Sequence, residues 1–293
     1  MPNTGFFLLV FLICALSCTS STEQINTPRH LNEDFKSYWY DGEAEISFYE
    51  LSQSRYGEER KGEMYLIFVT EDFNSQLQVK TEESKSTSES HFKLNWHQHF
   101  PTGIYDYNIM QSTFLSLENQ QNATKLVSSM QEWCGQSYLQ LNKRAGNFQV
   151  KLHSYFEEIN DNEFSIAQAY TENQLMLDLR IQPTLEQMPQ QMIPNLTYLQ
   201  LNQKEIKAYP VIFKQTIEAT QIVTQIEFPD LNRKVQIKQS NQFPYRIEQW
   251  KEAIGAEEEE QISEARLINS MRVDYWNKNK EKDLILRENL KTH

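Results

Sequence analysis

Two histidines in a strand-like segment are the best candidates for metal binding. One residue separates His97 from His99, and side chains at positions i and i+2 of a β-strand point to the same side. Both imidazoles could therefore bind one metal ion, with His91 or a carboxylate as the third ligand. The alternative, which we favour, is a solvent-exposed polar face of an amphipathic strand, with no metal and no other cofactor.

A cysteine beside a glycine is the best candidate nucleophile. Cys134 lies in the segment Gln131-Glu-Trp-Cys-Gly-Gln. Such a thiol can attack a substrate when a histidine removes its proton, and His153 is the candidate base if neighbouring strands bring it close. No helix N-terminus is expected at Cys134 to lower the pKa of the thiol. The alternative is a buried thiol beside a core tryptophan.

The carboxylates and the known catalytic motifs give little support to an enzyme. Glu43 and Glu45 share one face of an expected strand, and we expect that face to be solvated. The chain contains no Gly-x-Ser-x-Gly, no phosphate-binding loop, no dinucleotide fingerprint and no His-Glu-x-x-His. We therefore favour a protein without catalytic activity. A hydrolase that uses Cys134 or the His97/His99 face is the alternative.

The N-terminal residues predict export. Residues 6–16 form an apolar run that is too short to cross a bilayer as a helix, which needs about 20 apolar residues. The run has the length of the apolar core of a secretory signal. Cys18 follows Ala15, Leu16 and Ser17, and this order resembles the lipobox of bacterial lipoproteins.

In lipoproteins the lipobox cysteine becomes the first mature residue and carries the lipid. We therefore expect a signal peptide over residues 1–17, lipid attachment at Cys18 and a flexible tether over residues 18–33. Cleavage near Ser20, which would release an unanchored secreted protein, is the alternative. If Cys18 is acylated, Cys134 is the one remaining cysteine of the mature chain, and no intramolecular disulfide can form.

Composition limits the partners. The formal net charge is −12, and an acidic surface repels phosphate, so we expect no nucleic-acid partner. No later segment approaches the 18 uninterrupted apolar residues of a membrane-spanning helix. The expected contact with a membrane is therefore the lipid on Cys18.

Hydrophobic alternation predicts a mainly β fold of the α+β type. Most of residues 34–293 reads as short strands with short breaks, which favours an antiparallel meander. A helix is expected from Ser165 to about residue 180, and another over Asp283–Leu290. Leu196–Leu201 is expected to be a strand. We predict an antiparallel curved sheet, as a half-barrel or a sandwich, with one or two helices packed on it and two possible subdomains divided near residues 160–195.

Several short segments carry a resemblance to a known family. They are Tyr38-Trp-Tyr-Asp-Gly-Glu-Ala-Glu-Ile, Arg55-Tyr-Gly-Glu, Ile67-Phe-Val-Thr-Glu-Asp-Phe, Phe100-Pro-Thr-Gly-Ile-Tyr, Gln131-Glu-Trp-Cys-Gly and Phe243-Pro-Tyr. Together they resemble a family of Bacteroidetes (flavobacterial-type) lipoproteins whose members are often labelled "septum formation inhibitor Maf". True Maf proteins are cytoplasmic nucleotide pyrophosphatases with a Ser-x-Ser-x-Arg-Arg type motif, which this chain lacks. The resemblance implies an envelope location and a shared fold, and it carries no catalytic residues.

These observations lead to one favoured function and one main alternative. We expect an exported, lipid-anchored protein of the cell envelope, at the outer membrane and with a slight preference for its periplasmic face. We expect it to bind an apolar ligand, such as a lipid, or another envelope protein in the concavity of its sheet. A structural or assembly subunit of the envelope is the alternative.

Overall fold

The structure is a computed structural model that describes residues 28–81, 88–119, 122–256 and 258–292. The predicted signal peptide at residues 1–17 and the predicted lipid attachment at Cys18 lie outside the described residues. Within them, no helix is long and apolar enough to span a membrane.

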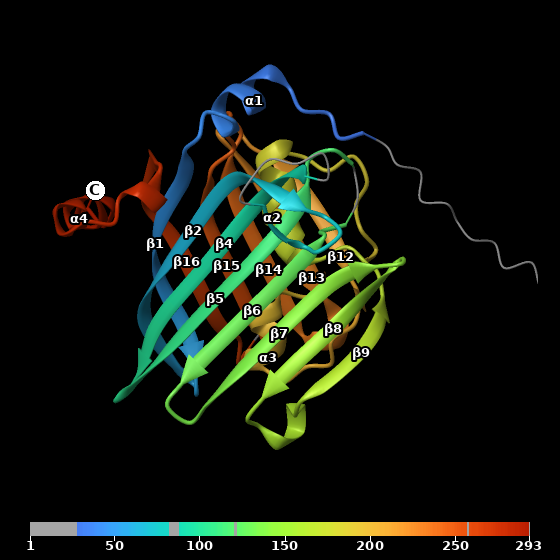
Figure 1. Ribbon diagram of the computed structural model, residues 1–293. Helices are drawn as coiled ribbons and strands as arrows, with labels where there is room; N and C mark the ends of the chain where they lie inside the picture. The colour runs from blue at the N-terminus through green and yellow to red at the C-terminus, as the bar shows by residue number, and fades with distance from the viewer. Residues whose placement is uncertain (1–27, 82–87, 120–121, 257, 293) are drawn as a thin grey trace, which may run out of the picture.

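One antiparallel sheet of 14 strands forms the described body. Its order is β12-β13-β14-β15-β16-β1-β2-β4-β5-β6-β7-β8-β9, and β3 pairs with β2 beside this path. The sheet curves without closing, and β12 and β9 are its two edges (Figure 1). The predicted mainly β fold with an antiparallel curved sheet is confirmed, and the form is that of one curved sheet.

The strands before and after residues 160–195 belong to this same sheet, because β1 pairs with β16. The strands of the sheet are β1 (Ala44–Arg55), β2 (Glu58–Asn74), β3 (Val79–Lys80), β4 (Ser88–Thr102), β5 (Tyr105–Ser116), β6 (Lys125–Glu132), β7 (Gly135–Arg144), β8 (Asn147–Ser154), β9 (Asn162–Ala167), β12 (Ile212–Ile217), β13 (Gln221–Phe228), β14 (Arg233–Ser240), β15 (Ile247–Ile254) and β16 (Gln261–Val273). A separate short pair joins β10 (Gln191–Met192) to β11 (Tyr209–Pro210).

Short helices complete the described body. The α-helices are α1 (Glu33–Trp39), α2 (Glu172–Ile181), α3 (Leu196–Leu201) and α4 (Leu284–Leu290), and the 3-10 helices are η1 (Glu157–Ile159), η2 (Pro229–Leu231), η3 (Tyr275–Asn277) and η4 (Glu281–Asp283). The C-terminal helix lies where the sequence predicts it.

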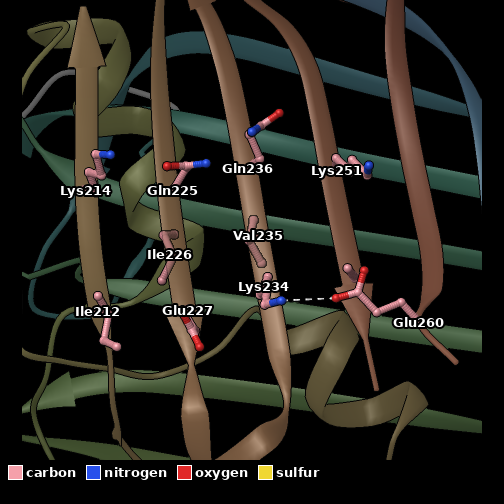
Figure 2. A pocket seen from close by; sticks show the side chains of 11 residues that line it. Ile212, Lys214, Gln225, Ile226, Glu227, Lys234, Val235, Gln236, Lys251 and Glu260 are labelled. Carbon is pink, nitrogen blue, oxygen red and sulfur yellow. Dashed lines mark hydrogen bonds and ion pairs between the residues drawn. The ribbon is translucent and has the colours of Figure 1, made fainter. Parts of the chain in front are cut away.

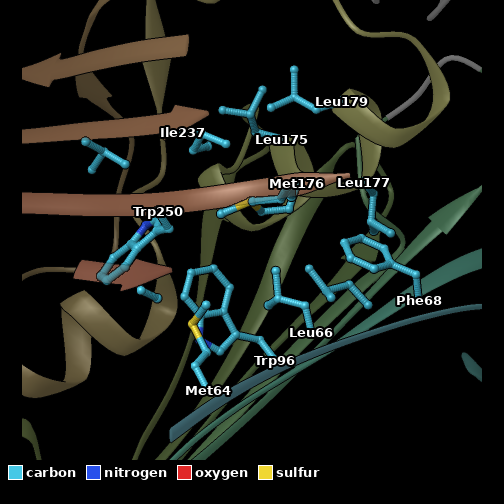
Figure 3. Close-up of a cluster of buried hydrophobic side chains, with 14 of the residues drawn as sticks. Met64, Leu66, Phe68, Trp96, Leu175, Met176, Leu177, Leu179, Ile237 and Trp250 are labelled. Carbon is cyan, nitrogen blue, oxygen red and sulfur yellow. The ribbon is translucent and has the colours of Figure 1, made fainter. Parts of the chain in front are cut away.

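Helix α2 fills the concavity of the sheet. All ten of its residues are buried, and its apolar side chains lie among those of strands β2, β4, β14 and β15 (Figure 3). The helix was expected to begin at Ser165, but Thr171 is its N-cap and accepts a hydrogen bond from the backbone N–H of Gln174. Residues 162–167 instead form β9, because they pair with β8.

Helix α3 corrects a second expectation. Residues 196–201 were expected to be a strand, and they form a helix whose N-cap, Asn195, accepts a hydrogen bond from the N–H of Thr197. The helix packs against β5 and β6, and its apolar side chains belong to the same buried cluster as Leu139 of β7 and Phe148 of β8. A short apolar run without clear periodicity fits a buried strand or a buried helix equally, which explains the wrong prediction.

Buried ion pairs fix α2 inside the sheet. Arg180 of α2 lies 2.8 Å from the carboxylate of Glu45 on β1, and neither side chain is accessible to solvent. Although burial favours the protonated carboxyl, Arg180 and Arg246 lower the pKa of Glu45. The expectation that Glu45 lies on a solvated face is therefore wrong, because this face of β1 points toward α2.

A second buried cluster joins the other end of α2 to the sheet. The guanidinium of Arg233 on β14 binds both carboxylate oxygens of Glu172, at 2.6 and 2.9 Å, and donates to Glu252 at 2.7 Å. Tyr198 of α3 lies over the guanidinium, with its ring centroid 4.3 Å away. Although burial opposes the charge, the two carboxylates raise the pKa of Arg233.

The segment before α1 is also attached to the body. Residues 18–33 were expected to be a flexible tether, but Pro28 pairs with Asn119 in an isolated bridge. Arg29 forms an ion pair with Asp178 of α2 at 2.7 Å, and both side chains are largely buried. The part of the expected tether from residue 28 onward therefore belongs to the folded body.

One buried histidine predicts acid sensitivity. His91 is fully buried, Nε2 lies 2.9 Å from Oγ1 of Thr124, and burial lowers its pKa from 6.5 to about 4. In the unfolded chain the imidazole takes up a proton as the pH falls below its ordinary pKa, whereas the folded chain resists protonation down to about pH 4. The protein therefore loses folding stability as the pH falls from the ordinary pKa of histidine, 6.5, to about 4. Between about pH 7 and pH 5, we expect His91 to lower the free energy of unfolding of the wild type by about 2 kcal/mol. The His91→Gln variant should not show this decrease.

Urea unfolding at the two pH values measures this difference. The exposed His153 gives the matched control, His153→Gln, which should follow the wild type. Parallel pH dependence of the wild type and the His91→Gln variant would contradict the prediction.

Candidate functional site

The concavity expected to hold a ligand is occupied by protein. Besides α2, the described interior contains a cavity of about 10 Å³ between α3 and strands β1, β4 and β15. Several side chains that line it carry buried polar atoms without a hydrogen-bond partner in the described structure, among them Trp96, Asn195, Tyr198 and Trp250. A cavity of this size and polarity suits one water molecule. This cavity, lined by described residues, is too small for a lipid.

The outer face of β12 to β15 carries a depression of about 370 Å³. Figure 2 shows that its side chains stand side by side along the strands, and that Lys234 and Glu260 interact across it. The other charged groups include Lys214, Lys251 and Glu227, so both signs are present. Its apolar side chains are few, and it is best described as a solvated, mixed-charge face.

A groove beneath α4 is the candidate ligand site. It measures about 430 Å³ and lies between the outer face of β1, β2, β4 and β16 and the C-terminal segment. Figure 1 shows α4 outside the sheet, beside β1 and β16. Most of its lining is apolar or aromatic, and the residues are Ile46, Tyr65, Ile67, His97, Met271, Val273, Tyr275, Lys278, Asp283, Leu286, Arg287 and Leu290. Its volume falls within the usual range for small-molecule sites.

Helix α4 covers the groove thinly. Leu290 is buried and Leu286 is half-buried, whereas Leu284 and Ile285 are 49% and 52% exposed. Trp276, in the preceding 3-10 helix, is 45% exposed. The apolar contacts of the cover are therefore few, and polar contacts help to hold it: Lys291 pairs with Glu63 of β2, and Asn269 of β16 donates to the carbonyl oxygens of Asn289 and Thr292.

Some charged groups of the groove have a hydrogen-bond or ion-pair partner in the described structure, and one does not. Lys278 binds Asp274 at 2.8 Å, and Asp283 accepts a hydrogen bond from the N–H of Lys280. Arg287 is exposed and has no ion-pair partner among the described residues. An apolar floor beside the exposed guanidinium of Arg287 fits an amphiphile with an apolar chain and an anionic head group.

The candidate metal residues fall in and beside this groove. His97 and His99 lie on the outer face, as their spacing predicts, but His97 lines the groove and His99 lies 3.5 Å from Asp106. Burial, with added repulsion from His99 and Arg287, lowers the pKa of His97. His91 is buried elsewhere, against Thr124. In the described ranges, no group of three or more His, Cys, Asp or Glu side chains is placed to hold a metal ion.

The candidate nucleophile and its candidate base are not brought together. Cys134 lies in the exposed turn between β6 and β7, and the expectation of a buried thiol beside a core tryptophan is wrong because Trp133 is 73% exposed. His153 contacts Tyr138 and Asp161 on the outer face. The side chain of Glu132 raises the pKa of the Cys134 thiol through a hydrogen bond and its negative charge. This environment weakens a nucleophile.

The environment of Cys134 predicts slow alkylation of its thiol. We expect iodoacetamide to modify Cys134 in the folded protein, because the thiol is exposed, but more slowly than it modifies free cysteine. Removal of the neighbouring charge by Glu132→Gln should increase the rate about two- to fivefold at neutral pH. Mass spectrometry of timed samples measures both rates. A rate above that of free cysteine would instead indicate an activated nucleophile.

Comparison of the chain with family models, curated proteins and solved structures gives no match.

Proposed function

We propose that the chain is an exported, lipid-anchored protein of the cell envelope that binds an amphiphile in the groove beneath α4 and has no catalytic role. The observation that carries the binding proposal is the groove itself, with its apolar floor, its thin helical cover and the exposed Arg287. The sequence around Cys18 and the resemblance to envelope lipoproteins support the location. The preferred ligand is a single-chain lipid with an anionic head group.

The lipid chemistry follows from the size and charges of the site. A groove of about 430 Å³ is suited to one acyl chain, since small-molecule sites of roughly 300–1,000 Å³ enclose ligands of drug size. Burial of each methylene of such a chain contributes about 0.8 kcal/mol. A carboxylate or phosphate at one end would pair with Arg287.

A fluorescent fatty acid tests the binding proposal. Dansylaminoundecanoic acid should bind the full chain with one-to-one stoichiometry, with a blue-shifted emission because the dansyl group leaves water. Unlabelled palmitate should displace it, whereas a methyl ester of the same chain should displace it less well because it lacks the anionic group. No saturable emission change, or displacement by neither lipid, would overturn the proposed ligand.

The location has a separate test. Cys18→Ser should abolish metabolic incorporation of labelled palmitate and should move the protein from the membrane fraction to the soluble fraction. Unchanged labelling in this variant would overturn the proposed anchor without affecting the groove.

A further inference from the structure

Four neighbouring hairpin turns at one end of the sheet carry large apolar side chains. The turns of β1–β2, β4–β5, β6–β7 and β8–β9 lie along the lower edge in Figure 1, opposite α1. Their tips expose Tyr56, Ile104, Trp133 and Tyr155, which are 58%, 84%, 73% and 78% exposed. Together with Tyr105, we call these residues the aromatic rim.

The aromatic rim is continuous from one hairpin to the next. The hydroxyl groups of Tyr105 and Tyr56 are 3.4 Å apart, and the ring centroids of Tyr105 and Trp133 are 6.4 Å apart. Tyr155 packs on Gly135, where an added Cβ would lie 2.9 Å from its Cδ1. Scattered exposed apolar side chains are normal on a protein surface, but a contiguous group marks an interaction site.

The aromatic rim is framed by negative charge. The same four hairpins, at residues 55–61, 102–106, 132–136 and 154–161, hold seven carboxylates and three cations. The carboxylates are Glu58, Glu59, Asp106, Glu132, Glu157, Glu158 and Asp161. Two of the three cations already have partners within the protein. Arg55 donates to the carbonyl oxygen of Leu201, and Arg60 pairs with Glu58.

We infer that the aromatic rim is a docking surface for a protein that presents basic side chains around an apolar centre. Tyrosine and tryptophan are the residues that most often carry the binding energy of protein interfaces. The acidic frame argues against two other occupants. It would be repelled by an anionic bilayer surface, and a symmetric contact with a second copy would place carboxylates against carboxylates.

A depression beside the aromatic rim fits the same partner. It has a volume of about 330 Å³ and is lined by His153, Tyr155 and Asp161, among others. Asp161 lies 3.6 Å from His153 and accepts a hydrogen bond from the N–H of Ser154. A lysine or arginine of the partner could enter this depression and pair with Asp161. This inference is independent of the groove beneath α4, which lies on a different part of the sheet.

Site-specific photo-crosslinking tests the inference in the full chain, expressed in the organism that encodes it. The photoreactive residue p-benzoylphenylalanine replaces Trp133, and in the matched control it replaces Leu77, which is 67% exposed in the turn after β2, at the opposite end. We expect one protein adduct at position 133, enriched at least about tenfold over position 77.

The captured protein is then purified and its affinity for the full chain is measured. Trp133→Ser and Tyr155→Ser should each weaken binding at least about tenfold, as expected for central interface aromatics, and added salt should weaken it further. Circular dichroism checks that these variants keep the fold. Adducts of lipid, adducts between two copies of the chain, equal capture at position 77, or an affinity that neither variant changes would each overturn the inference.

Discussion

Replacement of Arg233 by methionine should destabilise the protein by about 3–5 kcal/mol, because it leaves the carboxylates of Glu172 and Glu252 buried without their common partner. The carboxylates of Glu172 and Glu252 hold α2 and β15 to β14, because both accept hydrogen bonds of 2.6–2.9 Å from Arg233. The measurement is the free energy of urea unfolding at neutral pH. The matched control is Lys207→Met, which removes an exposed ion pair with Glu205 and should cost less than about 1 kcal/mol.

The destabilisation should depend on pH in a defined direction. Burial already raises the pKa of Glu252 in the wild type, and the loss of Arg233 should raise it further. A carboxyl with a folded pKa above its unfolded value destabilises the fold when ionised, so the penalty should be largest at neutral pH and should diminish as the pH falls toward its ordinary pKa.

A triple variant separates charge from packing. In Arg233→Met combined with Glu172→Leu and Glu252→Leu, no charge of this cluster remains buried, so part of the lost stability should return. A loss that is the same at every pH, and that the triple variant does not reduce, would show that packing rather than uncompensated charge is responsible.

Filling the groove should abolish ligand binding while the fold persists. Met271 lies on the groove floor at β16, and the larger indole of Met271→Trp should occupy the space of an acyl chain. We expect the dissociation constant for dansylaminoundecanoic acid to rise at least tenfold, which corresponds to about 1.4 kcal/mol. Fluorescence titration measures the change.

Two further variants make this result specific. Ile212→Trp adds the same side chain to the outer face of β12, outside the groove, and should leave the affinity unchanged. Arg287→Gln should weaken the anionic probe several-fold and a neutral acyl ester very little, because it removes only the charge that pairs with the head group. Equal losses in the groove variant and the Ile212→Trp variant would contradict the assignment of the site.

Alternation along the chain was enough to predict most strands, but it did not identify the inner face of β1. The alternation places Ile46 and Phe48 on the apolar face, whereas Glu45 pairs with Arg180 of α2 and the buried Tyr49 donates to the carbonyl oxygen of Ile247 on β15. The outer face of this strand is also apolar, because residues near the C-terminus cover it. The available signal was that Tyr49 and Leu51 share a face with Glu45, so that each face of β1 carries large apolar side chains, which indicates that both faces are covered.

The groove could not be predicted from local patterns. Its residues come from β1, β2, β4, β16 and α4, and only the long-range pairing of β1 with β16 brings them together. His97 was recognised as an outward-facing residue, but its place in an apolar groove depends on a helix nearly 190 residues later in the chain. The exposure of Cys134 likewise depends on the two-residue turn between β6 and β7, because alternation predicts strands on either side of it but not which turn residues lie in solvent.

Native mass spectrometry of the full chain, extracted from membranes in mild detergent, tests the central claim most directly. The wild type should carry one noncovalent lipid-sized mass in addition to any covalent anchor, and denaturing extraction should release it. The Met271→Trp variant should lack this mass, and the Ile212→Trp variant should retain it. A wild-type protein without the mass, or a lipid that persists when the groove is filled, would contradict ligand binding beneath α4.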